Sequence, residues 1–265
     1  MVGGTLSPGL ALRFMALAPV MRRRAGIPMA LRDSPAGRCC AACARAAATA
    51  APPPAYPQFG RRAYWEEFYR KRAAEGAARH FEWFLSPGRA VELIQDVVGP
   101  DSGAGRAALH VGCGTSTLGA DLLRADVCGS VTNTDTSATA VAEMVRAHGD
   151  EGCCTWLADD CTASALPDAA FDLVVDKGTM DALGFGEGGA GRVGRMVLEM
   201  HRLLRPGGVL IQFTDEPPER GRAEVLRRGV AWQGTRWRAA REDPEDLFGD
   251  DETGGFEYYM YWCNK

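Results

Sequence analysis

Short apolar runs alternate with amphipathic stretches through most of the chain from residue 107 onward. Runs rich in apolar and β-branched residues predict buried strands at 108–111, 130–135, 154–160, 171–178 and 206–215. Stretches with helical spacing lie between them at 116–125, 136–149 and 192–204. Strand and helix in this order predict parallel strands joined by crossover helices, in a sheet that is covered on both faces.

Two further helices are expected before the first of these strands. The stretch 64–76 places its large aromatic residues on one helical face. The second helix is expected to begin at Pro87, with Ser86 as its N-cap residue, and to end at Gly99.

The last part of the chain departs from the alternation. The stretches 230–240 and 254–265 are rich in aromatic and β-branched residues, and an acidic loop at 241–255 separates them. We expect them to form an antiparallel strand pair that closes the sheet. The predicted fold class is therefore α/β, with a doubly wound, mostly parallel seven-stranded sheet of Rossmann-like type and N-terminal helices.

The charge distribution divides the chain of 265 residues into two parts. Residues 1–55 contain seven arginines, no lysine and one acidic residue, and the proline-rich stretch 51–60 is typical of a linker. Positive charge without acidic residues is typical of a mitochondrial transit peptide that is removed after import; a disordered extension without a targeting role is the alternative. We expect a leader and linker at 1–55, one domain at 56–265, and a location in the mitochondrial matrix.

Composition also limits the partners. Beyond the leader, acidic residues outnumber basic ones, which argues against a surface for nucleic acid. No stretch approaches the ~20 apolar residues that span a bilayer, so membrane insertion is not expected. The nine cysteines contain no paired CxxC spacing with histidines, so no metal site is predicted and reduced thiols are the simplest interpretation.

The candidate chemistry lies where the predicted strands end. Gly112 and Gly114 follow the first strand, where glycine permits unusual backbone angles and lets a ligand approach backbone N–H groups at the start of a helix. Asp135 ends the second strand, and an acid at about this offset from the glycines reaches the two hydroxyls of a ribose. Because ligands of open parallel sheets bind beyond the carboxyl ends of the strands, this pattern predicts a nucleoside site.

The glycine spacing distinguishes two kinds of nucleoside ligand. A dinucleotide site has GxGxxG for the pyrophosphate, and Thr117 stands here in place of the third glycine. A nucleoside without phosphates fits better, and S-adenosylmethionine is the common one. An NAD-dependent oxidoreductase is the less favoured alternative, because the third glycine is missing and the chain ends in a closing strand pair.

Several stretches together resemble a known family. "VGCGTSTL", "NTDTS", "ADD", "FDLVVDKGTMDAL" and "LLRPGGVLIQFTDE" occur in the order found in the seven-β-strand methyltransferases that use S-adenosylmethionine, and the resemblance covers about residues 60–265. "YWEEFY", "FEWF" and "DKGTMDAL" resemble the subset that methylates protein lysines, including elongation-factor lysine methyltransferases and mitochondrial citrate synthase lysine methyltransferases. "GGVLIQFTDEPPE" and the basic leader resemble the last of these most. The acidic loop is longer and more charged than expected for the family.

The resemblance implies roles for individual residues. The cofactor-binding residues would be Trp65, Tyr69, Trp83, Gly112, Gly114, Asp135, Thr136, Asp160, Cys161 and Lys177. Aromatic faces suit a sulfonium cation and an adenine ring. Asp160 would accept a hydrogen bond from the adenine amino group, and Asp159 is the competing candidate.

The catalytic residues implied are Asp176, Lys177 and Asp181, at the end of the fourth strand. Asp176 or Asp181 could receive the ammonium of a substrate lysine. Lys177 is one of three lysines beside 27 arginines, and this rarity favours a special role. The implied activity is S-adenosylmethionine-dependent protein-lysine N-methylation, with citrate synthase as the suspected partner. A different substrate, such as an elongation factor, and a non-catalytic binding module on the same fold are the alternatives.

Overall fold

The computed structural model describes residues 57–76, 80–99, 103–241 and 257–265. The chain divides into two units, Met1–Ala55 and Tyr56–Lys265, and the described residues all belong to the second unit. The predicted leader and its boundary lie outside the described residues, as does all but the first residue of the acidic loop.

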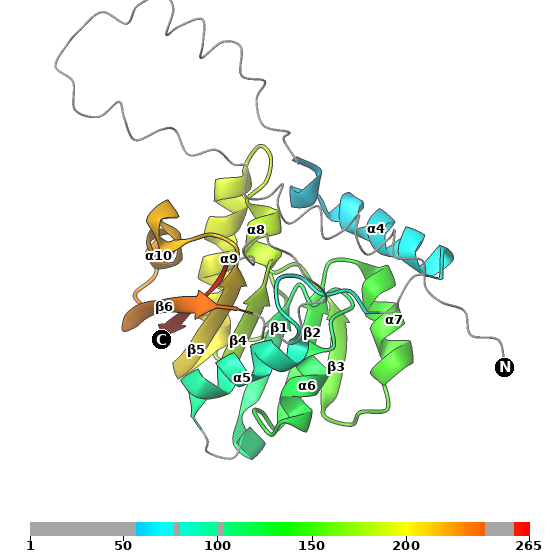
Figure 1. The fold of residues 1–265 in the computed structure, drawn as a ribbon, viewed down its shortest axis with the longest axis horizontal. Coiled ribbons are helices and arrows are strands. Elements are labelled where there is room, and N and C mark those ends of the chain that lie inside the picture. The colour runs from blue at the N-terminus through cyan, green and yellow to red at the C-terminus, as the bar shows by residue number, and fades with distance from the viewer. Residues whose placement is uncertain (1–56, 77–79, 100–102, 242–256) are drawn as a thin grey trace, which may run out of the picture. The chain divides into compact units, whose positions relative to one another are not determined.

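A seven-stranded sheet forms the centre of the second unit, with the strand order β3-β2-β1-β4-β5-β7-β6 (Figure 1). The strands are β1 (Ala107–Val111), β2 (Ser130–Asp135), β3 (Cys154–Ala158), β4 (Phe171–Lys177), β5 (Leu204–Thr214), β6 (Gly234–Ala240) and β7 (Tyr258–Asn264). Strands β1 to β5 pair in parallel, and β7 lies antiparallel between β5 and β6. The predicted fold class is confirmed.

The helices occupy most of the predicted positions. They are η2 (Pro57–Gly60), α4 (Arg62–Ala74), α5 (Pro87–Val98), η3 (Gly103–Gly105), α6 (Leu118–Arg124), α7 (Ala138–His148), α8 (Thr179–Leu183), α9 (Gly189–Leu203), η4 (Pro218–Arg220) and α10 (Arg222–Arg227). Ser86 caps α5 as predicted, because its Oγ accepts a hydrogen bond from the Arg89 backbone N–H at 3.3 Å. Helices α8 and α10 were not predicted, since five or six residues are too short to show a helical period.

The boundaries of several strands differ from the prediction, for example those of β5 and β6. Strand β6 begins at Gly234 rather than at residue 230, and β5 begins at Leu204 rather than at residue 206. Val230 and Trp232 lie in the loop before β6 and pack against the core, where the Trp232 indole N–H donates to the Leu226 carbonyl at 2.7 Å. These buried loop residues are of the same types as strand residues, which is why the strand was predicted to begin too early.

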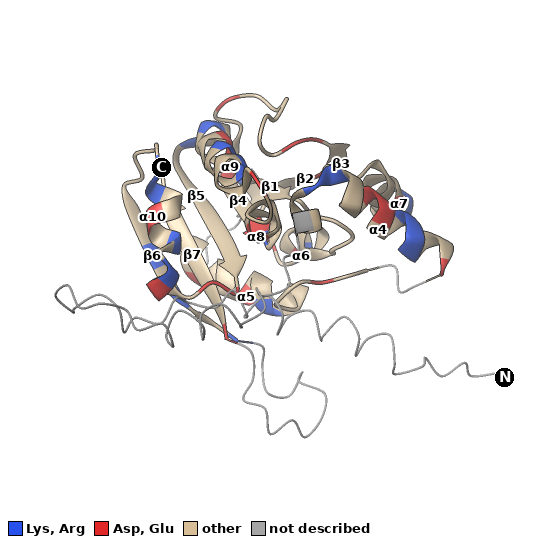
Figure 2. Cartoon of the chain, turned by 90° about the horizontal axis from the view of Figure 1, so that it is seen from above, with Lys and Arg blue, Asp and Glu red and all other residues tan. Residues whose placement is uncertain are grey.

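Side chains alternate between the two faces of the sheet, and each face has its own core. In β4, Leu173 and Val175 join the cluster that contains residues of α5 and α6, whereas Val174 joins the cluster that contains residues of α9. Figure 2 shows α9 and α5 on opposite sides of the strands. Fully burying one such side chain stabilises the fold by roughly 1.5–3 kcal/mol. The two cores on either face of the sheet therefore fix the positions of the strands and of the residues at their ends.

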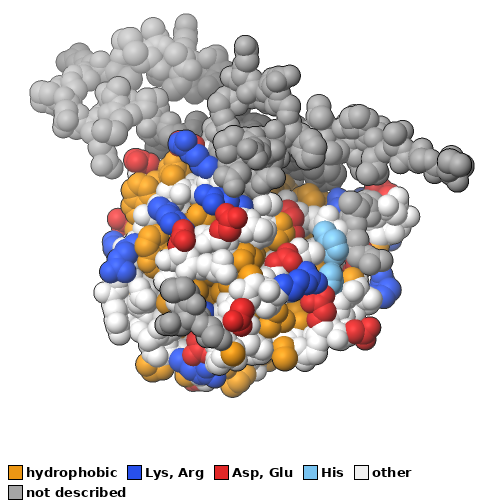
Figure 3. All heavy atoms as spheres, turned by 60° about the horizontal axis from the view of Figure 1, so that its bottom comes forward, with side chains coloured by type: hydrophobic (Ala, Val, Ile, Leu, Met, Phe, Trp, Pro, Cys, Tyr) orange, Lys and Arg blue, Asp and Glu red, His pale blue; other side chains and the backbone are white. Residues whose placement is uncertain are grey.

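The surface is mixed in character. On the face drawn in Figure 3, acidic and basic side chains are interspersed with apolar ones. Among the helices in the described part of the chain, none is both long and apolar enough to cross a bilayer.

Candidate functional site

The turn between β1 and α6 holds the two predicted glycines. Gly112 and Gly114 have φ values of 58° and 52°, which other residues rarely adopt. A Cβ on Gly112 would lie 1.9 Å from Oγ1 of Thr179, and a Cβ on Gly114 would lie 2.1 Å from Oη of Tyr69. Both glycines adopt the unusual backbone angles that the sequence predicted. They also allow the close approach of α8 and α4, which the sequence did not reveal.

Asp135 ends β2 beside this turn, as predicted. Its Oδ2 accepts a hydrogen bond from the Gly114 N–H at 2.9 Å, and its Oδ1 accepts one from the Ser137 N–H at 2.8 Å. Burial raises the pKa of this carboxyl, while the backbone N–H groups of Ser137, Gly114 and Thr136 lower it. Because a carboxylate has about four acceptor positions, these contacts leave acceptor capacity for a ligand hydroxyl.

These residues fit an adenosyl ligand. The remaining acceptor capacity of Asp135, at the end of the second strand, suits a ribose hydroxyl. Burial and the charge of Asp135 raise the pKa of Tyr69, whose hydroxyl lies at Gly114 and stays a hydrogen-bond donor. The buried Oγ1 of Thr115, in the same turn, has no hydrogen-bond partner within the described residues.

Three aromatic residues predicted for the cofactor pocket come together. The ring centroids of Trp65 and Tyr69 on α4 lie 6.4 Å apart, and those of Trp65 and Trp83 lie 6.2 Å apart. The indole N–H of Trp65 donates to the Phe59 carbonyl at 2.7 Å. The N-terminal segment thus brings an aromatic cluster to the tyrosine that covers the glycine turn.

Lys177, the last residue of β4, forms a buried ion pair. Its Nζ donates to Oε2 of Glu82 at 2.7 Å and to the Trp83 carbonyl at 2.8 Å, and its side chain is 2% exposed. Glu82 also accepts hydrogen bonds from Ser116 Oγ at 2.7 Å and from the Thr117 N–H at 3.1 Å. Lys177 therefore ties the segment around Trp83 to the glycine turn, and it is not a solvated loop lysine.

A second carboxylate of the N-terminal segment has a similar role. Glu66 on α4 accepts hydrogen bonds from Oγ of Ser137 at 2.7 Å and from Oγ1 of Thr139. It also accepts one from the Thr139 N–H at 3.4 Å, at the start of α7. The negative charge of Glu66 suits the positive end of this helix, so it fixes α4 beside Asp135.

The loop after β3 contains the residues expected near adenine. Asp160 is exposed, and its Oδ1 accepts hydrogen bonds from the N–H and Oγ1 of Thr162, both at 2.8 Å. Oδ1 of Asp159 accepts from the Ala165 N–H at 3.0 Å, and the Asp159 N–H donates to the Asp135 carbonyl at 3.1 Å. Cys161 is buried in the core on the α9 side, where burial raises the pKa of its thiol. Asp159 is therefore bound directly to β2, whereas Asp160 caps the turn that follows.

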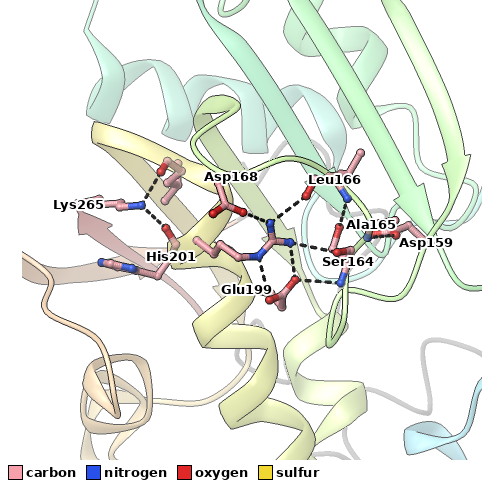
Figure 4. A network of polar contacts seen from close by, with 10 residues as sticks. Asp159, Ser164, Ala165, Leu166, Asp168, Glu199, His201 and Lys265 are labelled. Carbon is pink, nitrogen blue, oxygen red and sulfur yellow. Dashed lines mark hydrogen bonds and ion pairs between the residues drawn. The ribbon is translucent and has the colours of Figure 1, made fainter.

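Arg202 on α9 holds this loop in place. It donates to the carbonyls of Leu166 at 2.9 Å and Ser164 at 3.1 Å, and it pairs with Asp168 and Glu199. Glu199 in turn accepts from the Ser164 N–H at 2.9 Å. Figure 4 shows this network between α9 and the loop, with Asp159 at its far side.

The two predicted acids of the β4 end have different surroundings. Asp176 is fully buried, and its carboxylate accepts hydrogen bonds from the Thr179 N–H at 2.9 Å and from Nε2 of Gln212 at 3.0 Å. Burial, and next the charge of Asp181, raise the pKa of Asp176 to about 6. Asp181 on α8 pairs with Nη2 of Arg222 at 2.5 Å.

Sequence reasoning missed three charged residues of this site: Glu66, Glu82 and Arg222. The two glutamates stand among aromatic residues in "YWEEFY" and "FEWF". An acidic residue in such an aromatic segment is unusual unless it is paired, and this could have marked both glutamates. No local signal marked Arg222, because its partner Asp181 is 41 residues away.

A doubly wound sheet of this order, with a glycine turn and a strand-ending acid at the switch point, defines a Rossmann-like protein that binds a nucleoside. The family model described as "Methyltransferase domain" matches residues 109–212. The citrate synthase-lysine N-methyltransferase CSKMT, mitochondrial, of Danio rerio is 31% identical over 217 residues, which cover 77% of this chain and 82% of that protein. The chain belongs to the S-adenosylmethionine-dependent methyltransferases, and S-adenosylmethionine is its cofactor.

Two more comparisons agree with this membership. The EEF1A lysine methyltransferase 4 of Mus musculus is 30% identical over 178 residues, which cover 63% of this chain and 67% of that protein. The crystal structure of the [4+2]-cyclase SpnF has a TM-score of 0.54 at 17% identity and covers 80% of this chain and 96% of its own. At this identity the second likeness shows the fold alone.

Proposed function

We propose that this protein is a protein-lysine N-methyltransferase that acts on citrate synthase in the mitochondrial matrix. The observation that carries the proposal is the buried carboxylate of Asp181 at the carboxyl edge of the sheet, whose Oδ2 has no hydrogen-bond partner in the described part of the chain. An ammonium group is the donor that suits such an oxygen. The name of the Danio rerio relative suggests the target, and the composition of residues 1–55 suggests the compartment.

When bound, the cofactor supplies a methyl group on a positively charged sulfur. The chain must align the acceptor nitrogen and exclude water. In the proposed arrangement, Asp135 holds the ribose, and Trp65, Tyr69 and Trp83 cover the cofactor. A lysine has an ordinary pKa of ~10.4, so a partly desolvated position beside a carboxylate holds the ammonium until it loses its proton.

The other predicted residues take supporting roles in this proposal. Gly112 and Gly114 pass the backbone beside the methionine moiety, and Thr136 lies next to the ribose. Adenine lies against the loop after β3, with Asp159 or Asp160 as the acceptor of its amino group. Lys177 acts through Glu82, which it holds against the glycine turn.

Transfer of a labelled methyl group to citrate synthase tests the proposal. The full chain is incubated with labelled cofactor and purified citrate synthase, and mass spectrometry locates the modified lysine. Elongation factor 1A is offered in parallel, because the Mus musculus relative makes it the second candidate. Transfer to elongation factor 1A alone, or no transfer while calorimetry shows bound cofactor, would reject citrate synthase as the substrate.

A reporter fusion tests the compartment. Residues 1–55 joined to a fluorescent protein are expected to direct it to mitochondria. A variant with its seven arginines changed to glutamine is the control and should remain in the cytosol. A diffuse signal from the unchanged fusion would contradict the matrix location.

A further inference from the structure

Acidic side chains gather where β4 and β5 end, around one buried guanidinium. Oδ1 of Asp181 accepts hydrogen bonds from Oγ1 of Thr214 at 2.6 Å and from Nη2 of Arg222 at 2.5 Å. The same Nη2 pairs with Glu216, and the Arg222 side chain is 5% exposed. With Asp176 nearby, the carboxylates outnumber the guanidinium, so the cluster favours an additional cation.

The second oxygen of Asp181 shows where that cation belongs. The Asp181 side chain is 7% exposed, and its Oδ2 has no hydrogen-bond partner within the described residues. A buried acceptor without a donor costs about 1–3 kcal/mol. A ligand that donates a charged N–H would remove this cost.

Asp215 follows β5 directly and adds the second acceptor. It is partly buried, and among the described residues its carboxylate forms no hydrogen bond or ion pair, in contrast to Asp181. The pKa of Asp215 is raised to about 7, by burial, next by the charge of Asp181, and also by the charge of Glu216. Arg222 and Arg220 lower it but do not reverse this direction.

Titratable groups on the neighbouring strands β4 and β7 also contact or interact electrostatically with this acidic cluster. Burial, and next the charge of Asp181, raise the pKa of Asp176 on β4 to about 6. Tyr261 on β7 donates its hydroxyl to the Glu216 carbonyl at 3.1 Å, and burial raises the pKa of this hydroxyl. Asp181 is fixed by Arg222 and Thr214, whereas the Asp215 carboxylate has no such partner among the described residues and can accept from a further donor.

We propose that Asp215 is a catalytic residue that accepts the proton of the substrate ammonium, while Oδ2 of Asp181 holds that ammonium in place. This rests on the proposed lysine methylation. One N–H bond of the ammonium breaks and its electron pair stays on nitrogen, while an O–H bond forms on Asp215. The nitrogen lone pair then forms the bond to the methyl carbon as the carbon–sulfur bond breaks, and that electron pair goes to the sulfur of the methyl donor. Asp215 releases its proton to water when the product leaves.

A general base works best when its pKa lies near the operating pH. Asp215 meets this condition, whereas Asp181 is already engaged by the Arg222 guanidinium and the Thr214 hydroxyl. This division of roles makes the pH dependence of the reaction a direct test.

The experiment compares the wild-type chain with Asp215→Asn over pH 6–10, measuring kcat/KM for methyl transfer to citrate synthase. We expect the wild-type rate to rise through about pH 7 and then level. The variant should be about 100-fold slower at pH 7.5 and should gain with pH until the two rates approach each other near pH 10, where the lysine loses its proton unaided. Glu219→Gln, an exposed acid on η4, is the matched control and should keep the wild-type profile. A loss that is the same at every pH, or no loss, would overturn the proposal.

A second measurement does not depend on the protein substrate. Carboxyl ¹³C NMR follows Asp215 during a pH titration of the cofactor-loaded chain, with and without n-butylammonium chloride. We expect the ammonium to lower the titration midpoint of Asp215, and this effect should be absent with tetramethylammonium, which has no N–H, and in Asp181→Asn. If no protein is methylated but this shift occurs, the substrate assignment fails and the ammonium site stands. If the midpoint does not move in the wild-type chain, the inference fails whatever the substrate is.

Discussion

Removing either partner of the buried Lys177–Glu82 ion pair should lower the stability of the fold, but by different amounts. The Lys177 side chain is 2% exposed, whereas that of Glu82 is 24% exposed and keeps two other donors, Ser116 Oγ and the Thr117 N–H. Glu82→Gln leaves the Lys177 ammonium group buried without a carboxylate partner. Lys177→Met leaves a carboxylate that water and its other partners still solvate. The cost of a buried charge without its partner is therefore larger for the first change.

The magnitudes follow from these surroundings. Breaking a fully buried pair costs about 3–5 kcal/mol, and the Trp83 carbonyl and the new amide oxygen at position 82 still accept from Lys177, so we expect a loss of about 3 kcal/mol for Glu82→Gln. For Lys177→Met we expect about 1.5 kcal/mol, near the value of one hydrogen bond to a charged group. In a domain of this size these losses correspond to decreases in Tm of about 6–12 °C and about 3–6 °C.

Thermal and urea unfolding of the full chain measure both variants. Glu92→Gln, which removes the exposed carboxylate of a surface pair with Arg89, is the matched control and should change stability by less than about 0.5 kcal/mol. The double variant Glu82→Gln/Lys177→Met has no stranded charge and should be more stable than Glu82→Gln alone. Equal losses in the two single variants, or a double variant less stable than both, would refute the reasoning.

Three further predictions concern Asp135, the glycine turn and Asp215. Asp135→Ala should weaken cofactor binding in calorimetry by at least about 100-fold, and tight binding would reject the ribose contact. The same change should lower the free energy of unfolding by about 1–3 kcal/mol, because two backbone N–H groups lose their acceptor. Gly114→Ala should lose about 2–4 kcal/mol in urea unfolding, because a Cβ meets the Tyr69 hydroxyl. Gly76→Ala, with a φ of 62° and no described atom within 4 Å of its Cβ, should lose about 1–2 kcal/mol, and equal losses would show that the tyrosine moves freely. The folded-state pKa of Asp215 lies above its ordinary value of 3.8, so the stability it contributes is complete below about pH 4 and is lost as pH rises through 7. Asp215→Asn should therefore gain stability relative to wild type between pH 4 and pH 8 in urea titrations, and a constant difference would contradict the assignment.

Prediction from the sequence succeeded where the signal is local. The glycines at 112 and 114, the acid at 135 and the cap at 86 each depend on a few neighbouring residues, and the structure places them where the pattern indicated. The short helix that contains Asp181 was missed because it is formed by tertiary packing at the end of β4. The strand predicted from residue 230 began too early because buried loop residues have the same composition as strand residues.

The amino-acid sequence by itself determined the alternation of strands with most of the helices, the doubly wound class and the placement of Gly112, Gly114 and Asp135 at the carboxyl edge of the sheet, because hydrophobic period and turn residues act over short distances. Only the tertiary structure decided which charges meet. Lys177 pairs with Glu82, which is 95 residues away in the sequence, and Asp181 pairs with Arg222, which is 41 residues away. A buried charge is stable only beside a partner that packing brings to it, and no local pattern specifies that partner.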